Sequence, residues 1–203
     1  MANVQDVARF FIDMAQAQEK NKKGDGITQL RLQKMLYFAQ GWSLAREGKP
    51  LFEAEIEAWK YGPVVPEVYR TYSSFGPMTL REMNPVDRNR FKDSEYALLL
   101  DVAQKYAGDS TYKLVEMTHE NGGPWSGRAR SEIIPKDVIK KYFETHGTLE
   151  KYDALIAEKT PVIEAGVAED GAAILPAEMD DGEEWDEYDT TDCVGGLAGE
   201  RQI

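Results

Sequence analysis

The strongest structural signals lie between residues 30 and 72, which read LRLQKMLYFAQGWSLAREGKPLFEAEIEAWKYGPVVPEVYRTY. Thr28, just before this stretch, is a good N-cap, and the apolar residues that follow predict a helix to about Arg46 that is buried on more than one side. Gly48 is the expected end of this helix. Over 51–59, apolar residues alternate with glutamates, which predicts a short strand with one face in water. The sequence does not identify the partner of this strand.

A rigid corner is predicted directly after the strand. Gly62 can adopt the positive φ that a sharp turn requires, and Pro63 keeps the residue before it out of the helical region. Pro66 fits the first turn of a third helix, which should stop before residue 73. The corner is therefore expected to be stiff before any partner binds.

Three aromatic side chains surround this corner, and two interpretations of them remain open. They can fill the core, which is the expectation for Trp59. They can also present a surface to a partner, because a preorganised aromatic corner loses little conformational entropy on association. On this second interpretation Tyr61 and Tyr69 are candidate anchors for another protein.

Apolar residues at three- and four-residue spacing predict further helices in the rest of the chain. The first is capped by Asn3 and should end near Lys20. Residues 76–92 are expected to form a loop with short turns. The other helices are expected over 94–108 with Gly108 as the end, over 110–120, after Pro135 at a first helical turn, and over 149–159. The predicted fold class is mostly α with a small β element.

Charge divides the chain into two parts. The 203 residues carry a net charge of −12, and residues 161–203 alone contain 13 acids and one base, Arg201. Residues 1–160 are therefore neutral and are predicted to form one compact multi-helix domain, followed by a disordered acidic tail over 161–203. A neutral body and an acidic tail give no electrostatic attraction to nucleic acid or to an anionic membrane.

The cysteine content and the N-terminus indicate an intracellular protein. Cys193 is the only cysteine, so the chain can form no internal disulfide and no four-cysteine zinc site. The N-terminal residues lack the pattern of a signal peptide, and no segment is apolar enough to span a bilayer. We expect a cytoplasmic protein without a membrane partner.

Catalytic chemistry finds little support in the sequence. His119 and His146 are the only histidines, and neither is matched by a serine or cysteine in a nucleophile motif. His119 can be interpreted as a general base, or as a helix-end residue that bonds the carbonyls of the last turn and pins the loop after it. We favour the second interpretation, and expect His146 to end a helix too. We predict no catalytic residue, no metal site and no cofactor, and interpret the glutamates at 53, 55 and 57 as the wet side of the strand.

The motifs of residues 30–72 closely resemble those of the Panacea domain family, also called SocA-like, which occurs in bacterial and prophage toxin–antitoxin pairs. The pattern Leu-Gln-Lys-x-Leu-Tyr-Phe-Ala-Gln-Gly-Trp begins at Leu32. Gly-Lys-Pro-Leu-Phe, Ala-Trp-x-x-Gly-Pro-Val-Val-Pro and Val-Tyr follow, with every named residue present. A later element of the family, Thr-His followed by Gly-Pro-Trp, is matched at 118–125. The resemblance covers about residues 3–150 and leaves out the tail.

The resemblance implies a mostly helical domain that acts as an antitoxin, neutralising a cognate toxin protein by direct contact and without enzymatic activity. Candidate toxin-binding residues lie in the corner, in the loop after His119 and in the tail; they are Tyr61, Pro63, Tyr69, Tyr72, Trp125, Arg128, Trp185 and Tyr188. Residues expected to build the structural motif are Gln33, Lys34, Tyr37, Trp42, Trp59, Gly62, Pro66 and His119.

Three other functions are alternatives to the antitoxin function. In the first, the chain is a proteolytic adaptor whose body binds a toxin and whose tail delivers it to an energy-dependent AAA+ protease. In the second, it is a hydrolase that uses His119. In the third, it is a DNA-binding repressor, which the neutral body, the acidic tail and the absence of a helix with Lys and Arg on one face make the weakest. The sequence leaves the oligomeric state and the toxin's identity open.

Overall fold

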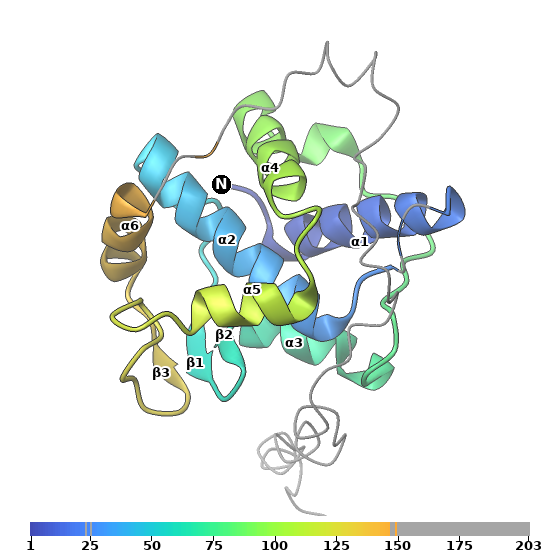
Figure 1. Ribbon diagram of the computed structural model, residues 1–203. Coiled ribbons are helices and arrows are strands. Elements are labelled where there is room, and N and C mark those ends of the chain that lie inside the picture. Colours follow the sequence, from blue (N-terminus) through green and yellow to red (C-terminus); the bar gives the residue numbers. More distant parts are fainter. Residues whose placement is uncertain (23, 25, 147–148, 150–203) are drawn as a thin grey trace, which may run out of the picture. The chain divides into compact units, whose positions relative to one another are not determined.

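The computed structural model describes residues 1–22, 24, 26–146 and 149. Within these residues the chain forms six α-helices and a small three-stranded sheet (Figure 1), so the predicted mostly α fold class is confirmed. The helix expected over 149–159, apart from Leu149, the tail over 161–203 and its candidate residues Trp185 and Tyr188 lie outside the described residues. The helices are α1 (Val4–Lys20), α2 (Gln29–Glu47), α3 (Pro66–Tyr72), α4 (Asp93–Lys105), α5 (Thr111–Thr118) and α6 (Lys136–Thr145).

The ends of the first three helices follow the sequence signals. The side chain of Asn3 accepts a hydrogen bond from Gln5 N at the start of α1, and Thr28 caps α2 in the same way. Gly48 ends α2 with a φ of 67°, and Pro66 is the first residue of α3. These signals act over three or four residues, which is why a single sequence is enough to place them.

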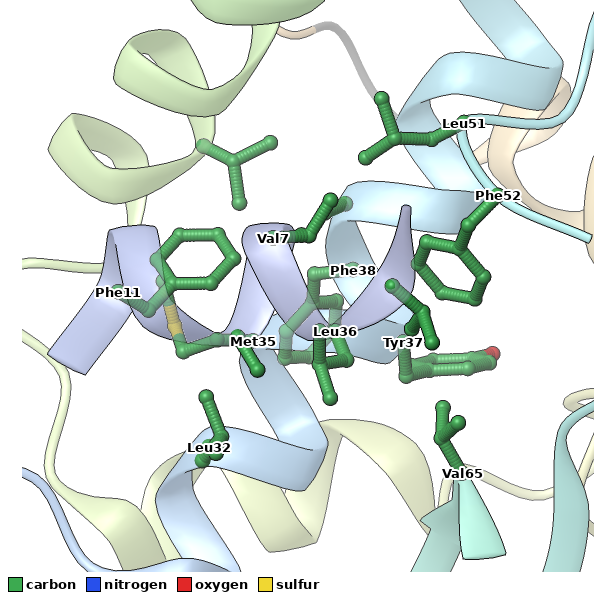
Figure 2. Packing of buried hydrophobic residues seen from close by; sticks show 14 of the residues in the cluster. Val7, Phe11, Leu32, Met35, Leu36, Tyr37, Phe38, Leu51, Phe52 and Val65 are labelled. Carbon is green, nitrogen blue, oxygen red and sulfur yellow. The ribbon is translucent and has the colours of Figure 1, made fainter. Parts of the chain in front are cut away.

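The helix α2 is the central element of the fold. It packs against α1, α3, α4, α5, α6 and the small sheet, and its residues are buried on more than one side, as predicted. Figure 2 shows Val7 and Phe11 of α1 beside Leu32 and Met35 of α2 in the hydrophobic core. Leu51 and Phe52 enter the same core from the irregular segment after α2, and Val65 enters it from the position directly before α3.

The strand predicted over 51–59 is shorter than expected, because only Glu57–Trp59 forms β1. Upstream of it, Gln40 binds the backbone from the side: its Oε1 accepts from the N–H groups of Leu51 and Phe52, and its Nε2 donates to the Phe52 carbonyl. Those backbone groups are therefore not available for a strand ladder. The alternation of more buried and more exposed side chains is nevertheless present in 52–58.

The partners of β1 come from both directions in the sequence. The strand β2 (Gly62–Val64) pairs with β1 in antiparallel register, with Trp59 opposite Gly62. The strand β3 (Glu132–Ile133) pairs with the other edge, so the order is β2-β1-β3. No local pattern predicts β3, and no element was expected at its two residues.

Two helix ends differ from the expectation. The helix α4 ends at Lys105, and Tyr106 rather than Gly108 follows its last turn. The buried ring of Tyr106 stacks on Phe38 of α2 at a centroid distance of 4.2 Å, so a tertiary contact sets this end. The helix α5 ends at Thr118 instead of continuing to residue 120.

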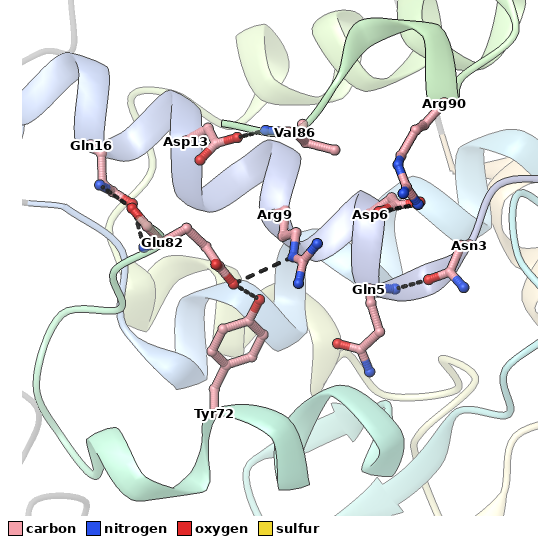
Figure 3. A network of polar contacts seen from close by, with 10 residues as sticks. All are labelled: Asn3, Gln5, Asp6, Arg9, Asp13, Gln16, Tyr72, Glu82, Val86 and Arg90. Carbon is pink, nitrogen blue, oxygen red and sulfur yellow. Dashed lines mark hydrogen bonds and ion pairs between the residues drawn. The ribbon is translucent and has the colours of Figure 1, made fainter. Parts of the chain in front are cut away.

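The segment 76–92 is fastened to α1 by polar side chains (Figure 3). Gln16 binds the backbone of Glu82 in both directions, through Nε2 to the carbonyl at 3.2 Å and through Oε1 to the N–H at 2.8 Å. Asp13 accepts a hydrogen bond from Val86 N, and partial burial raises the pKa of this carboxyl although the hydrogen bond lowers it. The predicted loop is thus irregular but held in place by several side chains.

None of the described helices has the length and apolar character of a membrane span.

Candidate functional site

The turn between β1 and β2 is the centre of the candidate site, and we call residues 59–66 the corner. Gly62 has a φ of +100°, as predicted for the turn. A Cβ atom on Gly62 would lie 2.6 Å from Thr118 Oγ1 and 2.7 Å from Lys34 Nζ. Glycine is therefore required at this position both by the backbone angle and by the close approach of two other elements.

Polar side chains of α2 hold the corner from the inside. Lys34 donates from Nζ to the Pro63 carbonyl at 3.2 Å, and Gln33 accepts from Val65 N at 2.8 Å. Gln29, one turn earlier, donates to the Tyr69 carbonyl at 2.8 Å. Because Lys34 is completely buried, desolvation lowers its pKa to about 7. The backbone conformation of the corner therefore depends on α2 as well as on Pro63 and Pro66.

The segment after α5 holds the corner from the other side. Trp125 donates from Nε1 to the Trp59 carbonyl at 2.8 Å. His119 follows the last residue of α5, with Nδ1 2.7 Å from the Val115 carbonyl and Nε2 3.3 Å from the Lys60 carbonyl. The centroid of the His119 ring lies 3.9 Å from that of the Trp125 ring. The carbonyls of residues 59, 60 and 63 therefore all lie against fixed side chains.

The position of His119 is that of the helix-end histidine preferred in the sequence. Its Nδ1 lies near the Val115 carbonyl and, at 3.4 Å, the buried Thr118 hydroxyl, while its Nε2 faces the Lys60 carbonyl, so both ring nitrogens point at groups of the fold. His146 also follows a helix, α6, and its Nδ1 lies 2.8 Å from the Tyr142 carbonyl. Both helix-end predictions are confirmed as positions in the fold.

The tyrosines expected to anchor a partner are largely inside the protein. Tyr61, Tyr69 and Tyr72 are 9%, 7% and 3% exposed, and Pro63 is buried as well. Trp59, expected in the core, packs edge-on against Tyr69 at 4.8 Å. This burial contradicts the interpretation in which Tyr61 and Tyr69 present exposed surface to a partner.

Two other predicted binding residues do reach the surface. Trp125 and Arg128 are partly exposed. Arg128 donates from Nε to the Pro124 carbonyl and pairs with Glu132 on β3. The Ala129 N–H and this guanidinium lower the pKa of the exposed Glu132 carboxyl. Lys60 is exposed as well. We call the side chains of Lys60, Trp125 and Arg128 the outer face of the corner.

The predicted structural residues divide into two groups on α2. Gln33 and Lys34 face the corner, as described above. Tyr37 and Trp42 surround Phe143 of α6, with ring centroids 5.4 Å and 5.1 Å from it. Burial raises the pKa of Tyr37 well above its usual value.

Sequence reasoning missed two side chains that shape this region, Gln29 and Gln40. Each is buried and binds backbone outside its own helix. The available signal was a set of glutamines within an apolar helix, since a buried amide needs a hydrogen-bonding partner. Such a signal shows that a partner exists without showing which segment supplies it.

No group of three or more metal-binding side chains occurs among the residues that the structure describes. Glu53 and Glu55 are exposed, and Glu57 accepts a hydrogen bond from Trp59 Nε1 at 2.9 Å. These three glutamates therefore lie as expected for the wet side of an extended segment.

Comparison with known proteins finds two similarities, and the first includes this region. Residues 32–126 match the family model described as "Antitoxin SocA-like, Panacea domain". The chain is also 37% identical over 114 residues to "Antitoxin SocA" of Caulobacter vibrioides (strain NA1000 / CB15N), an alignment that covers 49% of this chain and 58% of that protein. No solved structure matches the chain. The segment 32–126, which holds most of α2, the corner and Trp125, is therefore similar to the SocA-like Panacea domain.

Proposed function

We propose that the protein is an antitoxin that neutralises a cognate protein toxin by direct binding, and that the outer face of the corner makes this contact. The similarity to Antitoxin SocA supports the antitoxin role. The observation that carries the site is the set of hydrogen bonds from Lys34, Gln33 and Trp125 to the corner backbone. A surface fixed in this way loses little conformational entropy when a partner binds.

The outer face has the residue types that dominate protein interfaces. Trp125 contributes aromatic surface, and Arg128 and Lys60 contribute cationic groups at its edge. Tryptophan and arginine are enriched among the residues that carry most of the binding energy. We therefore propose that Trp125, Arg128 and Lys60 contact the toxin, and that the buried tyrosines of the corner help to hold them in position.

The experiment that tests this site is co-expression of the full chain with the product of the neighbouring gene, followed by measurement of the affinity of the purified pair. Lys60→Glu reverses one charge on the corner, and Lys20→Glu makes the same change on an exposed lysine in the last turn of α1. We expect the first to raise Kd at least tenfold and the second to leave it within about twofold. Equal effects would place the interface elsewhere.

The acidic tail is proposed to add a second contact, with a basic surface of the toxin. Replacing the acids at 183–189 by their amides should lower the affinity and flatten its dependence on salt, because fewer ionic contacts remain to be screened. An unchanged salt dependence would remove the tail from the interface.

The same co-expression distinguishes blocking from delivery to a protease. If the chain acts by blocking, the toxin should be silenced while its half-life in cells is unchanged. A shorter toxin half-life in the presence of the chain would favour the adaptor function instead.

A further inference from the structure

The turn after α5 presents an Asn-Gly pair to water. Gly123 N donates to the Glu120 carbonyl at 2.9 Å, so Asn121 and Gly122 occupy the two central positions of a β-turn. Gly122 has a φ of 81°, in the range that the second central position of a type II turn requires. Asn121 and Gly122 are exposed, whereas Gly123 and the residue after it are buried. The pair is therefore the accessible part of a turn whose following residues are fixed in the fold.

The surroundings of this pair favour a reaction between its two residues. A main-chain nitrogen can attack the side-chain amide of an asparagine directly before it, and glycine obstructs this attack least because it has no Cβ. A Cβ built on Gly122 would have no atom within 4 Å beyond its chain neighbours, so no other side chain shields the site. Within the described part of the chain, neither the Gly122 N–H nor the Asn121 amide takes part in a hydrogen bond. Both reacting groups are therefore available when the exposed turn opens locally.

Asn121 is the only one of the chain's five asparagines that precedes a glycine. Asn84 precedes a proline, whose nitrogen carries no hydrogen, and the side chain of Asn3 is bonded at the start of α1. Asn21 and Asn89 are exposed like Asn121, but each precedes a residue with a long side chain. These two asparagines are therefore matched comparisons within the same molecule.

We propose that Asn121 is a site of spontaneous modification, at which the chain itself converts the asparagine to a mixture of aspartate and isoaspartate. The Gly122 nitrogen forms a bond to Asn121 Cγ and loses its proton, while the bond from Cγ to the amide nitrogen breaks and ammonia leaves. The product is a succinimide ring. Water then opens the ring at Cγ, which gives aspartate, or at the main-chain carbonyl carbon, which gives isoaspartate. Nothing is oxidised or reduced, and water is the only co-reactant.

The modification falls between two side chains that hold the corner. His119, before Asn121, faces the carbonyl of residue 60, and Trp125, after it, donates to the carbonyl of residue 59. Isoaspartate lengthens the main chain between them by a methylene group, and both products place a new carboxylate next to Glu120, which already accepts a hydrogen bond from the Tyr142 hydroxyl. We therefore expect the modified turn to hold the corner less firmly. This proposal does not depend on the antitoxin role.

Incubation of the purified full chain at 37 °C, followed by mass analysis of its peptides, tests the reaction. Asn121 should be converted at least tenfold faster than Asn21 or Asn89. The rate should rise from pH 6 to pH 8.5, because the attacking nitrogen must lose its proton. Both aspartate and isoaspartate should form, since direct hydrolysis of the amide gives aspartate alone. Conversion of Asn121 at the rate of the other two, or without isoaspartate, would overturn the proposal.

Hydrogen exchange tests the effect on the corner. Asn121→Gln is the control, because glutamine would have to close a larger and more slowly formed ring. Incubation should accelerate exchange of the amides of residues 59–62 at least threefold in the unmodified chain and leave the exchange of the variant unchanged. Equal changes in the two proteins, with Asn121 converted, would show that the modification does not reach the corner.

Discussion

The Nζ atom of Lys34 lies 3.2 Å from the carbonyl oxygen of Pro63, in a completely buried position. No carboxylate in the described part of the chain forms an ion pair with it that would favour the charged amine, and desolvation lowers its pKa to about 7. A neutral amine remains a hydrogen-bond donor, so it holds the corner without an ionic partner. This arrangement has a measurable consequence for stability.

The free energy of unfolding should rise with pH between about 7 and 10. The folded chain releases the Lys34 proton near pH 7, whereas the unfolded chain keeps it to about 10.5. In this interval the unfolded state binds more protons, so raising the pH favours folding by up to about 1.4 kcal/mol per pH unit. Urea unfolding of the full chain and of Lys34→Met from pH 7.5 to 9.5 should therefore diverge by about 2–3 kcal/mol, the wild type gaining. Parallel curves would show that Lys34 is charged in the folded state.

Replacing Gly62 by alanine should destabilise the protein strongly. The side chain would meet Thr118 and Lys34 at 2.6 and 2.7 Å, in a backbone conformation with a φ of +100°. Gly48→Ala is the matched control, because Gly48 also has positive φ but no atom lies within 4 Å of its added Cβ. Thermal unfolding should show a loss of about 1 kcal/mol for the control and at least twice that for Gly62→Ala. Similar losses would mean that the backbone angle alone fixes this glycine.

Gln40→Leu should cost at least about 3 kcal/mol of stability. The change leaves the N–H groups of Leu51 and Phe52 and the Phe52 carbonyl without their buried partner, and each unsatisfied group costs about 1–3 kcal/mol. Gln104→Leu, on the exposed face of α4, should change stability by less than about 0.5 kcal/mol. Denaturant titration measures both, and equal effects would show that segment 51–52 keeps its shape without Gln40.

Tyr72→Phe should loosen the segment that is fastened to α1. The Tyr72 hydroxyl donates to Glu82 Oε1 at 2.6 Å (Figure 3), and burial together with this carboxylate raises the pKa of the phenol. Loss of the hydroxyl should cost about 1 kcal/mol and speed hydrogen exchange around residues 80–86. Tyr112→Phe, at an exposed position, serves as control. Unchanged exchange at 80–86 would show that the Tyr72 hydroxyl does not contribute to holding this segment.

The parts of the fold that depend on neighbouring residues could be predicted, and the parts that depend on distant ones could not. Asn3, Thr28 and Gly48 set helix ends through contacts within one turn, so the sequence places them. The end of α4 is set instead by Tyr106 stacking on Phe38, and β1 is paired with β3 across more than seventy residues. No local pattern carries that information.

The candidate site shows the same division. The angle at Gly62 follows from the residues around it, and His119 ends a helix as its sequence context indicates. The burial of Tyr61 was not predictable, because an aromatic ring at a turn suits a core or an interface equally well. Only the position of α3 and of the loop containing Trp125 decides between them.

The dependence of segment 51–65 on Gln40, Lys34 and Gln33 has a consequence for the folding pathway. This segment takes its conformation from side chains that project from α2, so it cannot become native before that helix exists. The helix precedes the segment in the chain and therefore leaves the ribosome first. The order of synthesis thus matches the order of assembly, and substitutions that weaken α2 should slow folding, whereas those in the segment should mainly accelerate unfolding.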